Sequence, residues 1–153
     1  MRLTTRTNLA MRVLMFCAVN SGRIVRSSEI AEACNASANH LSQVVHLLSV
    51  KGFVATTRGR SGGLQLGRDA GEITIGQVFR TFEAGVPFAE CFSGEENTCP
   101  LTAACRLRGI LARAVEAFYR ELDTITLDEL VQGNHDLSLL LAMQPDVRLP
   151  CHA

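Results

Sequence analysis

Several features of other protein classes are missing from this 153-residue sequence. No uncharged apolar run approaches the roughly 20 residues that a membrane-spanning helix needs. The apolar stretch over residues 9–19 is interrupted by Arg12 and no clear cleavage pattern follows it, so we expect a cytoplasmic protein. The chain also lacks a nucleophile–base pair, and its glycine-rich residues 59–63 are typical of a hairpin tip rather than a phosphate loop. We therefore do not expect an enzyme.

The six cysteines lack the close pairs that are typical of a structural zinc site. Cys91, Cys99 and Cys105 are separated by seven and five residues, with no histidine nearby. Iron-sulfur clusters are held by thiolates that need no tight pairs, and three thiolates leave one iron open to a small ligand. We expect these three cysteines to hold an iron-sulfur cluster; the alternative is that they are small buried hydrophobes. The remaining cysteines are expected to pack in the core, for Cys17 and Cys34, or to lie in the tail, for Cys151.

The formal charge of zero conceals an uneven distribution along the chain. Residues 1–68 contain nine Lys and Arg against two Glu, a net charge of +7, so the remainder carries −7. A basic half is typical of a protein that binds a polyanion, and the acidic half should face away from DNA.

The spacing of apolar residues predicts three helices in the basic half. The first covers residues 8–20, and the second begins near Ser27, Ser28 and Glu29 and ends at Asn35. Ser37 is expected to cap the third, which ends at Gly52. One apolar face of that helix contains Leu41, Val44, Val45 and Leu48. This order predicts a helix-turn-helix.

Two short strands, residues 53–57 and 64–66, are expected to form a β-hairpin wing with arginines at its tip. In a helix-turn-helix, the second helix enters the major groove with its N-terminal residues, and a wing adds phosphate or minor-groove contacts. The alternative is an ordinary solvated polar face. The candidate DNA-binding residues are Ser28, Ser37, Asn39, His40, Gln43, Arg58 and Arg60.

The acidic half is expected to contain a short helix over residues 75–82, the cysteine loop and a long helix over residues 103–122. The apolar stripe of the long helix needs a partner, which suggests a dimer. A capping box over residues 126–129 begins a last short helix. The predicted fold is mainly α with a small β-hairpin: a winged helix-turn-helix at 1–70, a cluster-binding loop and dimerisation helix at 71–135, and a tail at 136–153.

Several of these segments together resemble the Rrf2 family of winged-helix repressors, over nearly the whole chain. The segments are Leu3-Thr4, residues 7–14, residues 37–41, residues 58–64, Cys91, Cys99 and residues 104–107. Within the family, the resemblance is closest to the repressors that sense nitric oxide. It implies a homodimer crossed by the long helix, one cluster per subunit, and loss of DNA binding when nitric oxide attacks the cluster.

The resemblance also bears on the fourth ligand of the cluster. The members that regulate iron-sulfur biogenesis have a ligating histidine three residues after the last cysteine, where this chain has Arg108. The nitric-oxide sensors use an aspartate from the partner's first helix, and the matching residue here is Asn8. The resemblance therefore implies a weakly held fourth site, filled by Asn8 of the partner subunit, water, a thiol from solution, or Glu90 or Glu95. A 4Fe-4S cluster is the first expectation and a 2Fe-2S cluster the second.

The function expected from the sequence is a DNA-binding repressor that reads a palindromic operator and whose iron-sulfur cluster senses nitric oxide. One alternative is a regulator that senses iron-sulfur supply or redox state. Another is an iron-sulfur electron-transfer module, against which the basic half and the wing argue.

Overall fold

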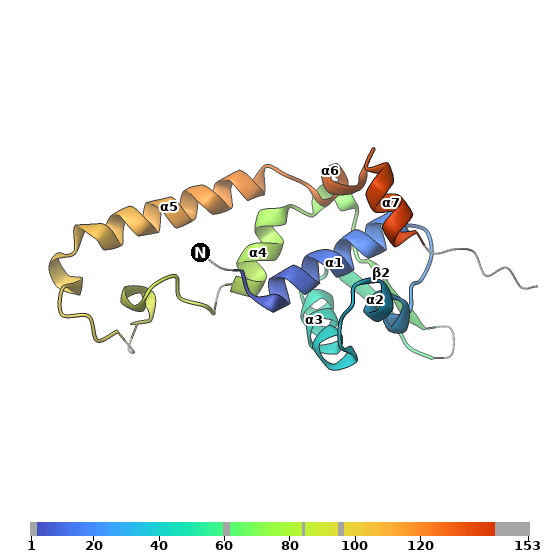
Figure 1. Ribbon diagram of the computed structural model, residues 1–153, viewed down its shortest axis with the longest axis horizontal. Helices are drawn as coiled ribbons and strands as arrows, with labels where there is room; N and C mark the ends of the chain where they lie inside the picture. The colour runs from blue at the N-terminus through green and yellow to red at the C-terminus, as the bar shows by residue number, and fades with distance from the viewer. Residues whose placement is uncertain (1–2, 60–61, 84, 95–96, 143–153) are drawn as a thin grey trace, which may run out of the picture.

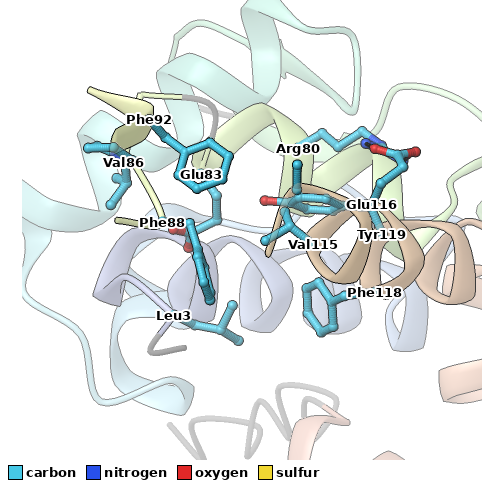
Figure 2. Close-up of a pocket in the computed structure, with 12 residues that line it drawn as sticks. Leu3, Arg80, Glu83, Val86, Phe88, Phe92, Val115, Glu116, Phe118 and Tyr119 are labelled. Carbon is cyan, nitrogen blue, oxygen red and sulfur yellow. Dashed lines mark hydrogen bonds and ion pairs between the residues drawn. The ribbon is translucent and has the colours of Figure 1, made fainter. Parts of the chain in front are cut away.

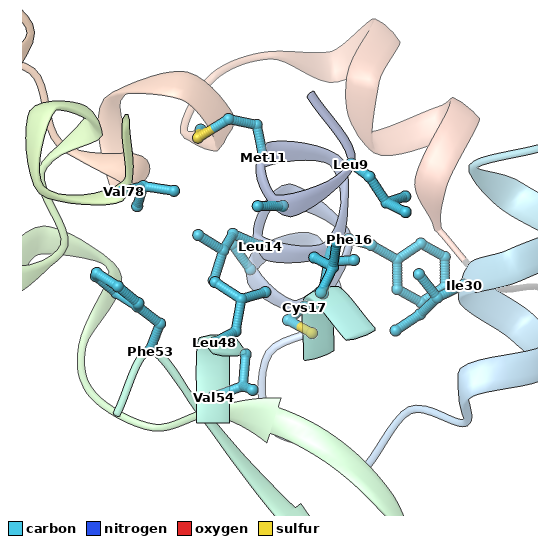
Figure 3. Packing of buried hydrophobic residues seen from close by; sticks show 14 of the residues in the cluster. Leu9, Met11, Leu14, Phe16, Cys17, Ile30, Leu48, Phe53, Val54 and Val78 are labelled. Atoms are coloured by element: carbon cyan, nitrogen blue, oxygen red, sulfur yellow. The ribbon is translucent and has the colours of Figure 1, made fainter. Parts of the chain in front are cut away.

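The central element of the fold is α1 (Thr5–Val19), which contacts α3, α4, α6, α7 and β2 (Figure 1). The computed structural model describes residues 3–59, 62–83, 85–94 and 97–142. The helix begins three residues earlier than the sequence predicts, because the Thr4 side chain accepts a hydrogen bond from the Thr7 N–H and caps it. Nine residues of α1 are buried, and Figure 3 shows Phe16 facing Ile30 in the core. This helix therefore organises the single core that the described residues form.

The predicted helix-turn-helix is confirmed as α2 (Ser27–Ala33) followed by α3 (Ala38–Val50). Asn35 closes α2 in the left-handed region, at φ 47°, which asparagine tolerates better than most residues. Ser37 caps α3 by accepting a hydrogen bond from the His40 N–H at 3.3 Å. The N-cap of α2 differs from the expectation: it is Arg26, whose N–H donates to Glu29 Oε2 at 2.6 Å.

The predicted wing is confirmed as an antiparallel pair of strands, β1 (Val54–Thr57) and β2 (Gly63–Leu66). Gly52 lies between α3 and β1 with φ 73°. This left-handed backbone conformation is unfavourable for most residues that have a side chain, but not for glycine. Val25 and Leu64 exchange two backbone hydrogen bonds of 2.9 and 2.8 Å. The wing is therefore fixed to the segment that precedes α2.

The acidic half begins with a 3₁₀ turn, η1 (Ala70–Glu72), and α4 (Ile75–Glu83). Two further 3₁₀ turns, η2 (Glu90–Phe92) and η4 (Thr102–Ala104), lie in the loop that leads to α5 (Arg106–Asp123). The predicted start of the long helix at residue 103 is wrong, because the chain makes η4 first and Cys105 becomes the N-cap of α5. Every residue of α5 stays at least partly exposed, and the helix extends away from α1 (Figure 1).

Two short helices complete the described chain. The capping box at Thr126 and Glu129 begins α6 (Leu127–Val131) as predicted, with the Thr126 N–H donating to Glu129 Oε1 at 3.0 Å. The second, α7 (His135–Leu141), was not predicted from the sequence; it contacts α1, and Asn20 Nδ2 donates to the Leu141 carbonyl at 2.9 Å. Across the described residues, no helix combines the length and the apolarity that crossing a membrane requires.

Candidate functional site

The outer face of the helix-turn-helix gathers most of the predicted DNA-binding residues. Asn39, His40 and Gln43 are exposed on α3, while Leu41 is buried on its opposite face. Ser28 of α2 and Ser42 of α3 line one groove of about 390 Å³ between the two helices. Ser42 was not among the contacts predicted from the sequence, although it lies between His40 and Gln43.

Other predicted contacts are placed differently. Ser37 is exposed, but its side-chain oxygen already serves as the cap of α3. Arg58 is exposed directly after β1, on the wing. Arg60 lies outside the described residues, as do Glu95 and Cys151.

Arg6 of α1 is a residue of this face that the sequence analysis did not identify. Its Nη2 donates to Gln43 Oε1 at 3.2 Å, and both side chains are exposed. The two residues are 37 positions apart, so no local pattern could have revealed the contact. A second arginine of α1, Arg12, donates to the Cys34 carbonyl at 3.1 Å.

The first turn of α1 is bonded to the end of α4 through one carboxylate. Glu83 Oε1 accepts hydrogen bonds from the Thr4 N–H at 2.9 Å and the Thr4 hydroxyl at 3.0 Å. It also accepts a short hydrogen bond from the hydroxyl of Thr7, which is completely buried. Asn8 follows on the exposed side of the same helix. The start of α1 is therefore held against the residue from which the cysteine loop departs.

The first cysteine segment of that loop is bonded to the second. Cys91 lies in η2, next to Glu90, whose carboxylate accepts from the Thr98 N–H at 2.9 Å and the Thr98 hydroxyl at 2.6 Å. Both hydrogen bonds lower the pKa of Glu90, and the one from the Thr98 hydroxyl has the larger effect. Because Thr98 precedes Cys99, this carboxylate connects two of the three cysteine positions.

A second set of hydrogen bonds connects Cys99 to the turn before Cys105. The Cys99 N–H donates to Asn97 Oδ1 at 3.1 Å, and Asn97 Nδ2 donates to the Thr102 hydroxyl at 2.9 Å. The Thr102 hydroxyl in turn donates to the Cys99 carbonyl at 2.9 Å. These hydrogen bonds hold Asn97, Cys99 and Thr102 together directly before Cys105.

The chemistry of the three thiols fits an iron-sulfur cluster. Cys91, Cys99 and Cys105 are free and partly buried, all within one loop. Cys105 is the N-cap of α5, directly after the 3₁₀ turn η4. Within the described residues, however, no three His, Cys, Asp or Glu side chains are grouped closely enough to hold a metal ion. The single chain thus supplies suitable donors without gathering them into a ready-made site.

Aromatic residues join the cysteine loop to α5 around a cavity of about 420 Å³ (Figure 2). The rings of Phe88 and Phe92 meet edge to face with centroids 6.5 Å apart. The guanidinium of Arg108 lies 6.0 Å from the centroid of the Phe92 ring. Arg108 therefore contacts the loop, and it occupies the position where the regulators of iron-sulfur biogenesis are expected to have a ligating histidine.

Arg80 joins α4 to α5 on another wall of this cavity (Figure 2). Its Nη2 lies 3.1 Å from Glu116 Oε1 and 2.9 Å from Asp123 Oδ2, and its guanidinium lies 4.5 Å from the centroid of the Tyr119 ring. The hydrogen bonds to Glu116 and Asp123 raise the pKa of Arg80, and the one from Arg80 lowers the pKa of Glu116. Desolvation raises the pKa of Tyr119. These contacts fix the direction in which α5 leaves the body of the protein.

Cys17 and Cys34 are buried in the core, in agreement with the expected packing role. Burial raises the pKa of Cys17 to about 12, with a smaller contribution from Cys34. Burial also raises the pKa of Cys34, against an opposing effect of Arg12. Both thiols are therefore kept protonated at neutral pH, unlike a metal-ligating or reactive cysteine.

Comparisons with known proteins agree with this architecture. The Rrf2 family model, described as an iron-dependent transcriptional regulator, matches residues 3–133. The HTH-type transcriptional regulator NsrR of Geobacillus kaustophilus is 42% identical over 142 residues, which is 92% of this chain and 97% of that protein. Protein aau3 of Rhizobium meliloti is 40% identical over 148 residues, 97% and 96% of the two chains.

The fold is also similar to that of a solved structure. CymR, described as the global cysteine regulator of B. subtilis, has a TM-score of 0.67 and 26% identity over 86% of this chain and 96% of its own. The similar regulators bind DNA to control transcription and are not enzymes. A family match over most of the chain, together with these identities, shows that the chain belongs to the Rrf2 family of transcriptional regulators.

Proposed function

We propose that this regulator is a homodimeric cytoplasmic repressor whose DNA binding is controlled by an iron-sulfur cluster that senses nitric oxide. The observation that carries the proposal is the placement of three free, partly buried thiols, Cys91, Cys99 and Cys105, on the loop between α4 and α5. Similarity to NsrR over most of the chain supports it. The chemistry that such a cluster supplies when bound is the reactivity of iron toward small ligands.

We assign DNA binding to residues 1–70, cluster binding and dimerisation to residues 71–135, and a C-terminal tail that includes most of α7 to residues 136–153. In a symmetric dimer, two copies of α3 would enter major grooves about one helical turn, or a multiple of it, apart, which requires a palindromic operator. The proposed contacts to base edges and phosphates are Ser28, Ser37, Asn39, His40, Gln43, Arg58 and Arg60.

The chain's own contacts provide a physical connection between the two functions. The cysteine loop packs on α5 through Phe92 and Arg108, and α4, which precedes the loop, is bonded to the first turn of α1 through Glu83. Since α1 also contacts α3, a change in the loop can alter the spacing of the two recognition helices.

For the fourth ligand we favour Asn8 of the partner subunit, because Asn8 is exposed on α1 and available to a second chain. Glu90 is the weaker candidate, because its carboxylate already accepts two hydrogen bonds from Thr98. A neutral amide oxygen is a weaker ligand than a carboxylate, so this position should be labile. We favour a 4Fe-4S cluster over a 2Fe-2S cluster.

The decisive experiment measures operator binding by anaerobically purified protein before and after stoichiometric nitric oxide. A swing from 99% bound to 99% free requires about 5.5 kcal/mol, or an affinity change of about 10⁴-fold. Unchanged affinity would refute nitric oxide sensing. Cys99→Ala should abolish the visible absorbance, iron and sulfide, whereas Cys17→Ala, which removes a buried core thiol, should retain them. Full iron and sulfide in Cys99→Ala would remove Cys99 from the ligand set.

A second candidate is a regulator that responds to iron-sulfur supply or redox state. Its support is the structural similarity to CymR of Staphylococcus aureus, whose crystal structure is described as an oxidized form. Measuring operator affinity after nitric oxide, oxygen and iron chelation in turn separates the two, since a dedicated nitric oxide sensor should respond to the first at stoichiometric amounts.

A further inference from the structure

The amide of Gln43 on the recognition helix is held in one orientation by Arg6. Arg6 Nη2 donates to Gln43 Oε1 at 3.2 Å. A guanidinium can only donate hydrogen bonds, whereas a glutamine amide has an acceptor oxygen and a donor nitrogen on opposite sides. The Gln43 oxygen therefore faces Arg6, and its NH₂ group is directed away from Arg6.

The position of Arg6 is itself defined by neighbouring contacts. The Thr4 side chain caps the turn by accepting from the Thr7 N–H at 3.2 Å. The Thr4 N–H and hydroxyl donate to Glu83 at 2.9 and 3.0 Å, and the hydroxyl of the buried Thr7 donates to the same carboxylate oxygen. Arg6 thus projects from a turn that is bonded to α4, rather than from a free chain end.

We infer that Arg6 is a positioning residue that determines which base edge Gln43 reads. The inference rests on the proposed function, in which α3 enters the major groove. With its oxygen held by Arg6, Gln43 offers its NH₂ group to acceptors: purine N7, guanine O6 or thymine O4. Without Arg6 the amide can turn and accept from adenine N6 or cytosine N4, so discrimination at that base pair weakens.

The test begins with selection of a binding sequence from a randomised DNA duplex library by the anaerobically purified wild-type protein. Affinities are then measured for the selected duplex and for all its single base-pair variants. Gln43→Ala identifies the base pair that Gln43 reads. Arg6→Met keeps an unbranched side chain but removes the donor, and it is expected to reduce the preference at that base pair by about two- to tenfold. Preferences at the other base pairs should be unchanged.

Two controls separate positioning from attraction to phosphate. Arg6→Lys keeps the charge and a donor, and it should retain most of the preference at the Gln43 base pair. In a Gln43→Ala background, Arg6→Met should change no base preference, because its effect acts through Gln43. Circular dichroism checks that each variant is folded. Because both side chains are exposed, we expect these substitutions to leave the fold intact.

Three results would overturn the inference, and they differ in what else they overturn. If Arg6→Met weakens binding to every duplex equally and leaves the preference intact, Arg6 is only a phosphate contact. If it alters base preference equally with and without Gln43, Arg6 reads DNA itself. If the wild type selects no sequence, or Gln43→Ala alters no preference, the proposed role of α3 fails and the inference fails with it.

Discussion

The exposed face of α5 gives the sharpest prediction, because two of its apolar side chains remain more than half exposed in the described structure. Leu107 and Ile110 are 57% and 52% exposed, and their spacing of three residues places them on one side of the helix. We predict that replacing both with Asp converts the proposed homodimer to a monomer.

The magnitude follows from the remaining exposure. Full burial of a Leu or Ile side chain contributes about 1.5–3 kcal/mol. Since roughly half of each side chain is still exposed, dimerisation can gain about 0.8–1.6 kcal/mol from each. A two-fold symmetric dimer buries four such side chains, which gives about 3–6 kcal/mol, or about 10²–10⁴-fold in the dimer Kd. Burying aspartates at the same positions would add to the loss.

Sedimentation equilibrium over a range of protein concentrations measures the dimer Kd directly. The matched control is Val50→Asp, which places the same charge on an apolar side chain that is 66% exposed at the end of α3. The control should dimerise as the wild type does. An unchanged dimer Kd in the Leu107 and Ile110 variant, with its helix content intact by circular dichroism, would refute the assignment of this face to the dimer interface.

Three further perturbations test other parts of the structure. Gly76→Ala places a Cβ against the carboxylate of Asp123 and should lower the free energy of unfolding by about 1–3 kcal/mol, measured by thermal unfolding. The control, Gly109→Ala, changes an open position on α5 and should not lower the free energy of unfolding. Asn8→Asp supplies a stronger ligand and should slow the loss of cluster absorbance in air; equal or faster loss would argue against Asn8 as a ligand. Burial raises the pKa of Cys17 to about 12, so above about pH 9 the unfolded chain loses a proton that the folded chain keeps. The free energy of unfolding should therefore fall by about 1 kcal/mol per pH unit between these values, and Cys17→Ala should reduce that slope.

Local signals in the sequence predicted the elements that depend on residues a few positions apart. Asn35 closes α2, Ser37 caps α3, and Thr126 begins α6, because each uses a hydrogen bond or backbone conformation within about one helical turn. The same kind of reasoning placed the start of α5 too early, since an apolar pattern does not distinguish the 3₁₀ turn before Cys105 from the helix itself.

The sequence by itself thus determined the helix-turn-helix, the wing and the position of three cysteines on one loop. Only the tertiary structure decided that Arg6 contacts Gln43, and that Glu83 receives the hydrogen bonds of the first turn of α1. These partners lie 37 and 79 positions apart, and nothing in local propensity or periodicity selects one distant polar side chain over another. Their pairing follows from how the helices pack around α1, which depends on the whole core at once.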